Sequence, residues 1–191
     1  PTLAQLDVLN KQIRNDSVNP DLYEQRAKFY LENNEFNEAY KDIISALEID
    51  STYAGYHVTL ADIYLGMGKL KKTAQSLEKA ISLDASYVDA YLKLAELSIV
   101  IRDYEKALGY IDKALKEDEL AAKGYLLRGV VMIENGDTVR GIRNLQRAID
   151  FNQDYFEAHL QLGILYSEKS NQLAVDYFNN ALNIDPGNTE V

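Results

Sequence analysis

Residues 103–115 read DYEKALGYIDKAL, with Ala107 and Ala114 seven positions apart. Seven residues are close to two turns of an α-helix, so both alanines lie on one helix face. Related stretches occur at 36–47, FNEAYKDIISAL, and at 173–182, LAVDYFNNAL. The pattern predicts a helix that recurs along the chain and presents small side chains where another helix comes close.

The recurrence has a period of 34 residues, with one residue deleted inside the last unit, after Gly163. One column of small residues steps through the chain at this period: Ala46, Ala80, Ala114, Ala148 and Ala181. A second small column is Ala27, Ala61, Ala95, Gly129 and Gly163, and a third, less strict, is Ala39, Thr73, Ala107, Gly141 and Ala174. Each unit is predicted to be two amphipathic helices of about 14 residues each. Because such a pair cannot bury its apolar face alone, the units are expected to stack into a solenoid.

Short polar segments mark the expected turns within the units: ENNE at 32–35, GMGK at 66–69, ENGD at 134–137 and EKSN at 168–171. A polar column marks the expected end of each second helix: Asp50, Asp84, Asp118, Asn152 and Asp185. Asp and Asn are favoured N-cap residues. We therefore expect this column to cap the helix that follows it.

The pattern resembles the tetratricopeptide repeat (TPR) family, whose signature runs from an aromatic residue through Leu-Gly, Tyr, Ala, Phe and Ala to Pro. Residues 156–188 match best, through LGILY at 162–166, ALNIDPGN at 181–188 and His159 in the aromatic position. Residues 88–121 match through Tyr91, Leu94, Ala95, Tyr104, Ala107 and Ala114. The resemblance implies an all-α fold, a right-handed α-solenoid of antiparallel helix pairs with about five TPR units plus an N-terminal helix.

The expected organisation follows from the period. Residues 1–19 hold an N-terminal capping helix or partial repeat, whose apolar stripe is Leu3, Leu6, Leu9 and Ile13. The five repeats are placed at 20–53, 54–87, 88–121, 122–155 and 156–188, and residues 189–191 start a further helix or a tail. Since this C-terminal end carries no polar cap, we expect the natural protein to continue or the end to self-associate.

Composition narrows the functional classes. The formal net charge is −10, which disfavours nucleic acid as a partner because phosphate must be neutralised by basic residues. Apolar runs such as 99–101 are far shorter than the roughly 20 residues of a membrane span, so we expect no membrane insertion by this region. The absence of cysteine excludes disulfides and thiolate metal sites. The compartment, cytoplasmic or periplasmic, stays open.

No set of residues points to catalysis, a cofactor or a metal. His57 and His159 are 102 positions apart, three periods, so they occupy the same repeat position as Tyr23, Tyr91 and Tyr125 and are expected to be packing residues. GMGKL at 66–70 lacks the earlier glycine and the Ser or Thr of a phosphate-binding loop. We therefore expect a protein that is not an enzyme and needs no cofactor.

The resemblance implies that the first helix of each pair lines a concave face that binds a peptide. The predicted peptide-binding residues are Glu24, Lys28, Asp62, Leu92, Glu96, Ile99, Leu126, Val130, Ile133, Leu160 and Ile164. They suggest a groove that is acidic towards its N-terminal half and apolar towards its C-terminal half. Some family members clamp a peptide carboxylate with basic and amide side chains, but here Val58 and Asp62 stand where such groups would help.

The sequence thus predicts a non-catalytic scaffold that binds a protein or peptide segment, apolar, basic or both, in the concave groove. The same aliphatic residues could instead only pack against neighbouring helices. The alternative function is a TPR regulatory or docking region of a longer protein, attached to an enzyme or a cell-envelope assembly factor. Self-association through the C-terminal end is a further expectation.

Overall fold

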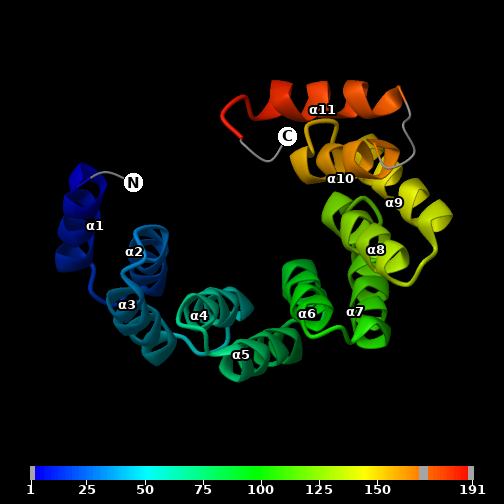
Figure 1. Cartoon of the computed structure of the whole chain (residues 1–191). Coiled ribbons are helices and arrows are strands. Elements are labelled where there is room, and N and C mark those ends of the chain that lie inside the picture. Colours follow the sequence, from blue (N-terminus) through cyan, green and yellow to red (C-terminus); the bar gives the residue numbers. More distant parts are fainter. Residues whose placement is uncertain (1–2, 168–171, 189–191) are drawn as a thin grey trace. The chain divides into compact units, whose positions relative to one another are not determined.

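The computed structural model describes residues 3–167 and 172–188, which form eleven α-helices and no strand (Figure 1). The predicted all-α class is confirmed. The chain divides into two compact units, residues 1–94 and 95–191, and the boundary falls within α6. The predicted turn at 168–171 and the predicted helix start at 189–191 lie outside the described residues.

The N-terminal unit begins with α1 (Leu3–Asn15) and continues with two antiparallel pairs. These are α2 (Pro20–Glu32) with α3 (Phe36–Ile49), and α4 (Ala54–Gly66) with α5 (Leu70–Leu83). Helix α6 (Val88–Val100) follows. We call α2, α4, α6, α8 and α10 the first helices, and α3, α5, α7, α9 and α11 the second helices.

The C-terminal unit contains α7 (Tyr104–Glu117) and two further pairs. These are α8 (Ala122–Glu134) with α9 (Thr138–Phe151), and α10 (Phe156–Ser167) with α11 (Leu173–Ile184). The first helices begin at residues 20, 54, 88, 122 and 156, a constant step of 34. The residue ranges of the individual repeats stay a prediction.

Small residues lie where the two helices of a pair approach each other. All five alanines of one column are completely buried: Ala46, Ala80, Ala114, Ala148 and Ala181. In the α8–α9 pair, Gly129 and Gly141 face each other so closely that a Cβ on either would stand 3.1–3.2 Å from the carbonyl oxygen of the other. Small side chains therefore set the distance between the helices, and larger ones fill the space beside them.

The turn from a first helix to its second helix has the same geometry in four places. Its central residue has positive φ at Asn34, Gly68, Arg102 and Gly136, again 34 apart. The next amide donates to a carbonyl five residues earlier, as from Glu35 to Tyr30 at 2.8 Å and from Asp137 to Met132 at 2.8 Å. These are Schellman closures, which satisfy the last carbonyls of the first helix and reverse the chain direction.

The Asp and Asn residues at the ends of the second helices were expected to cap the helix that follows, and this prediction is wrong for Asp50. Asp50 accepts from the backbone amide and the hydroxyl of Thr52, at 2.8 and 2.7 Å, and Asp84 binds Ser86 in the same way. The helix that follows Asp50 has its N-cap at Tyr53, without a side-chain cap. The column therefore makes Asx turns in the loops between pairs and does not cap the next helix.

Helix α1 has the register of a second helix, because it ends at Asn15, 34 residues before the end of α3. Ile13 is its one buried residue among those described, whereas Leu3 and Val8 are exposed. Asn19 caps α2 by accepting from the Asp21 amide at 3.2 Å, and Pro20 starts that helix. Helix α1 is thus held mainly by α2.

None of the described helices is long and apolar enough to span a lipid bilayer.

Candidate functional site

The predicted peptide-binding residues are distributed over all five first helices. In the N-terminal unit these are Glu24 and Lys28 of α2, Asp62 of α4 and Leu92 of α6. In the C-terminal unit they are Glu96 and Ile99 of α6, Leu126, Val130 and Ile133 of α8, and Leu160 and Ile164 of α10. Their role in binding stays a prediction, but their environments differ sharply.

The acidic members in the N-terminal unit are bound to neighbouring side chains. Glu24 accepts from the Thr59 hydroxyl at 2.8 Å and pairs with Lys28 at 2.9 Å. Asp62 pairs with Lys93 at 2.8 Å. These contacts join α2 to α4 and α4 to α6, so the carboxylates link successive first helices and their charge is largely compensated within the protein.

A buried hydrogen bond strengthens the same junction between α2 and α4. The hydroxyl of Tyr56, whose side chain is almost fully buried, donates to the carboxylate of Asp21. Burial raises the pKa of Tyr56, and the nearby Asp21 carboxylate raises that pKa further. The phenol therefore stays protonated at neutral pH and can donate to the Asp21 carboxylate.

The C-terminal unit also has an ion pair that joins two successive first helices. Glu96 of α6 pairs with Lys123 of α8 at 2.9 Å. Sequence reasoning missed Thr59, Lys93 and Lys123 as partners of the predicted residues. The available signal was charge complementarity at a separation close to one period: Lys93 follows Asp62 by 31 positions and Lys123 follows Glu96 by 27.

The apolar members fall into two groups. Leu92, Leu126 and Leu160 occupy the same repeat position and expose only 5%, 9% and 7% of their surface. Ile99, Val130 and Ile133 are half-buried, and Ile164 is 40% exposed. The leucines therefore belong mainly to the packing between helices, and the β-branched residues are the ones that offer apolar surface to another molecule.

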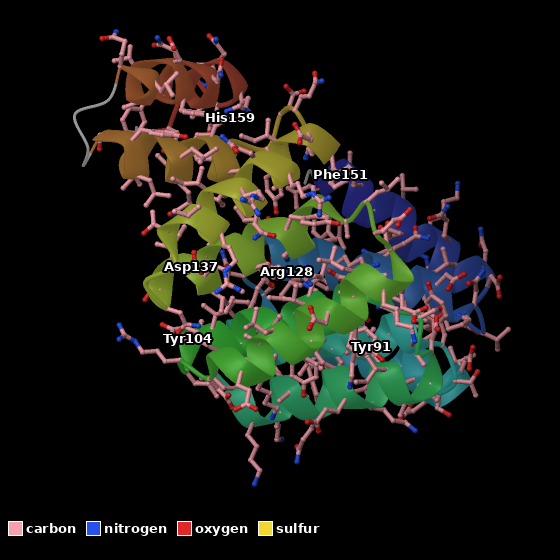
Figure 2. All side chains as sticks on the ribbon, turned by 90° about the vertical axis from the view of Figure 1, so that its right-hand side faces the viewer. Tyr91, Tyr104, Arg128, Asp137, Phe151 and His159 are labelled. Atoms are coloured by element: carbon pink, nitrogen blue, oxygen red, sulfur yellow. The ribbon has the colours of Figure 1, made fainter. Side chains whose placement is uncertain are left out.

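His159 takes part in a packing contact that recurs along the chain. Residues in the aromatic position interact with the backbone carbonyl oxygen six positions earlier, in the loop before the helix. The pairs are Tyr23–Ser17 at 3.1 Å, Tyr125–Glu119 at 3.1 Å and His159–Gln153 at 2.9 Å. His159 lies on α10 and is buried (Figure 2). Its ring lies against that of Tyr177, with ring centroids 6.0 Å apart. A ring N–H of histidine replaces the tyrosine hydroxyl in this contact.

An open pocket of about 610 Å³ lies between α1 and α2. Its walls include Val8 and Leu9 from α1 and Phe29 from α2. Lys28, one of the predicted site residues, also lines it. By the 34-residue register, Leu9 corresponds to Ile43 of α3, which is completely buried against the neighbouring helices.

Across residues 3–167 and 172–188, no group of three or more His, Cys, Asp or Glu side chains is arranged to hold a metal ion.

Comparison with known proteins identifies the repeat. Residues 58–122 match the tetratricopeptide repeat family. No curated protein sequence matches the chain.

Solved structures with a similar fold include MamA, YrrB and PilF. MamA has a TM-score of 0.65 at 21% sequence identity, covering 87% of this chain and 92% of its own. YrrB, described as a TPR protein with an unusual peptide-binding site, has a TM-score of 0.62 at 20% identity, covering 95% of this chain and 94% of its own. PilF of Pseudomonas aeruginosa has a TM-score of 0.80 at 19% identity, covering 91% of this chain and 79% of its own.

The family match lies in the middle of the chain, and the helices before and after it keep the same step of 34 residues and the same turn geometry. The similarity to the solved structures extends the fold over most of the chain. Residues 58–122 therefore match the tetratricopeptide repeat family, and the described helices before and after them continue the same helical repeat.

Proposed function

We propose that the protein is a non-catalytic scaffold that binds an apolar polypeptide segment on the first helices of its C-terminal unit. One observation carries this proposal. Ile99, Val130, Ile133 and Ile164 repeat at two positions of successive first helices and keep part of their apolar surface exposed. A repeated row of β-branched side chains suits an extended or helical segment with regularly spaced apolar residues.

The charge distribution supports an apolar partner more than a basic one. Each of the three carboxylates among the predicted residues already has a partner within the protein: Glu24 has Thr59 and Lys28, Asp62 has Lys93, and Glu96 has Lys123. A basic peptide would have to compete with these contacts. YrrB, which has a similar fold, is described as having a peptide-binding site, and this description is consistent with a peptide ligand here.

The test uses a peptide selected from a random displayed library against the whole chain, with its affinity measured by fluorescence anisotropy. The double variant Val130→Glu, Ile164→Glu is expected to bind the peptide at least about tenfold more weakly, because two carboxylates would be desolvated in the contact. The control variant Val139→Glu, Leu120→Glu changes two exposed apolar residues outside the first helices and is expected to bind normally.

The control and the far-UV circular dichroism spectrum separate binding from folding. If both double variants bind equally well, or lose affinity equally with unchanged helicity, the first helices are not the binding surface. Selection of basic peptides whose binding depends on Asp62 or Glu96 would shift the proposal from an apolar to a basic partner.

A docking region of a larger assembly is the second candidate. It is favoured by α11, where Leu173, Val175 and Leu182 are exposed. In that case α11 would be covered by another part of the same protein or by a second copy. This candidate predicts that selected peptides bind more weakly to the Leu182→Glu variant. The same peptides should bind the Val130→Glu, Ile164→Glu double variant normally.

A further inference from the structure

A second pocket, of about 250 Å³, opens between α4 and α5. Most of the residues that line it have polar or charged side chains, unlike those of the pocket beside α1. The lining residues are His57, Leu60, Tyr64, Lys72, Gln75, Ser76 and Lys79. Nothing in the proposed peptide site involves them, since the proposed site lies on the C-terminal unit.

The repeat register explains why this pocket is open. The position of Ser76 is Asp42 in the first pair and Tyr110 in α7. Asp42 accepts hydrogen bonds from both Nε and Nη2 of Arg26, each at 2.6 Å. The position of Arg26 is Leu60 in the second pair. The second pair therefore lacks both the ion pair of the first and the aromatic ring of α7.

The two lysines beside Ser76 are also explained by comparison with α7. There, Lys106 and Lys113 both lie over the Tyr110 ring, with each Nζ 5.9 Å from the ring centroid. Lys72 and Lys79 hold the corresponding positions on α5. Between them stands a small hydroxyl instead of a ring, so two cations flank an open space.

These cations are not neutralised by the described part of the chain. No carboxylate among the described residues pairs with Lys72 or Lys79. The Lys72 Nζ lies over the Tyr64 ring, 5.2 Å from the ring centroid. Two ammonium groups at one pocket without a paired carboxylate make that pocket locally basic within a chain whose formal net charge is −10.

The opposite wall adds a polar atom without a partner. His57 Nε2 is buried and makes no hydrogen bond. The Ser76 side chain, on the α5 wall, is also buried. Such groups are costly in a folded protein unless a ligand or water satisfies them.

We propose that this pocket binds an oxyanion of the phosphate type. The ammonium groups of Lys72 and Lys79 supply charge, the Ser76 hydroxyl and the Gln75 amide supply neutral donors from α5, and His57 supplies a donor from α4 when its ring is protonated. A tetrahedral phosphoryl group has enough oxygens to meet donors on both walls, whereas a carboxylate has two. The anion would be a free phosphate or a phosphoryl group on a ligand.

The experiment titrates the whole chain with inorganic phosphate at constant ionic strength and follows the backbone amides of α5 and the imidazole signals of His57 by NMR. Saturable shifts confined to these residues are expected. Lys72→Gln and Lys79→Gln should each weaken binding at least about fivefold, and Lys71→Gln, on the same helix but outside the pocket, should leave it unchanged.

A filling variant gives a second test. Ser76→Tyr restores the ring found in α7 and should abolish the phosphate-dependent shifts while the circular dichroism spectrum stays helical. The proposal is overturned if the shifts do not saturate, or if Lys71→Gln weakens binding as much as the pocket variants do. Should Ser76→Tyr fail to fold, the lysine variants decide the question alone.

A parallel titration with a phosphoserine peptide distinguishes the two sources of the phosphoryl group. Tighter binding of the peptide than of inorganic phosphate assigns the pocket to a phosphorylated ligand, and equal or weaker binding assigns it to the free anion. This outcome is independent of the peptide site on the first helices, because none of the pocket variants touches Val130 or Ile164.

Discussion

At the residue scale, the same position in different repeats is filled by side chains that solve one physical problem in different ways. The aromatic position shows this most directly. Tyr23 and Tyr125 donate a hydroxyl to a loop carbonyl, and His159 makes the same contact through Nε2. Histidine is therefore tolerated here as a packing and hydrogen-bonding residue, although histidine as a residue type can change its charge between pH 5 and pH 8, where tyrosine stays neutral.

The consequence can be measured at His57. Burial lowers the pKa of His57 below its ordinary value, and the nearby Lys79 ammonium lowers that pKa further, against the opposing effect of the hydrogen bond to Ser51. The unfolded chain therefore takes up a proton at this residue at a higher pH than the folded chain does. The contribution of neutral His57 to the free energy of unfolding is fully present above about pH 6.5, and it is lost as the pH falls towards the pKa of His57 in the folded protein.

We expect His57→Tyr to lose less unfolding free energy than the wild type between pH 7.5 and pH 5.5, because tyrosine keeps the loop contact without titrating in that range. Urea denaturation followed by circular dichroism measures the difference. His159 and the carboxylates are common to both proteins, so they cancel in the comparison. Equal losses in the two proteins would contradict the prediction.

At the scale of the element, the chain is a series of helices whose ends are set by backbone geometry. The first helices end in Schellman turns that need a left-handed residue, supplied by glycine at Gly68 and Gly136 and by Asn34 and Arg102 elsewhere. Glycine adopts this conformation without strain, whereas a β-carbon costs about 1 kcal/mol or more. The turn therefore accepts several residue types at different energetic cost.

Two glycine-to-alanine changes separate the effect of the turn from that of the helix. Gly136→Ala, where φ is 81°, is expected to lower the unfolding free energy by about 1 kcal/mol. Gly109→Ala, in the interior of α7 with open space around the new methyl group, is expected to raise it by about 0.5–1 kcal/mol. Denaturant unfolding measures both, and changes of the same sign would show that the turn geometry is not what sets the cost.

At the scale of the whole molecule, each helix is stabilised by its immediate neighbours, as in other repeat proteins. The amount of that support varies along the chain. Helix α4 has eight buried residues and α8 has six, whereas α1 has Ile13 and α11 has Ala174 and Ala181. Local stability should follow this distribution.

Native-state hydrogen exchange tests this expectation. The slowest amides should lie in α4 within the N-terminal unit and in α8 and α10, which have six buried residues each, within the C-terminal unit. The fastest helical amides should lie in α1 and α11. The difference arises because α1 and α11 bury few side chains, so opening them exposes little apolar surface. Protection of α1 equal to that of α4 would contradict this account.

The family and the helix pairs could be predicted from sequence because the signal is repeated. A period of 34 with small residues such as Ala46, Ala80 and Ala114 in phase gives several independent observations of one packing geometry. The burial of these alanines and the constant spacing of the first helices agree with it. Single features, such as the capping role expected of Asp50, were less secure, since the same side chain can bind its own loop equally well.

The sequence by itself therefore determined the fold class, the helical repeat and the packing role of His159, because each depends on residue types repeated at a fixed spacing. Only the tertiary structure decided which first-helix residues keep exposed surface, because this depends on contacts between residues about one period apart. Those contacts neutralise Asp62 through Lys93 and bury Leu92, but they leave Ile164 partly exposed. They also leave a pocket at Ser76, where a small side chain between two lysines meets an unpartnered nitrogen on the facing helix.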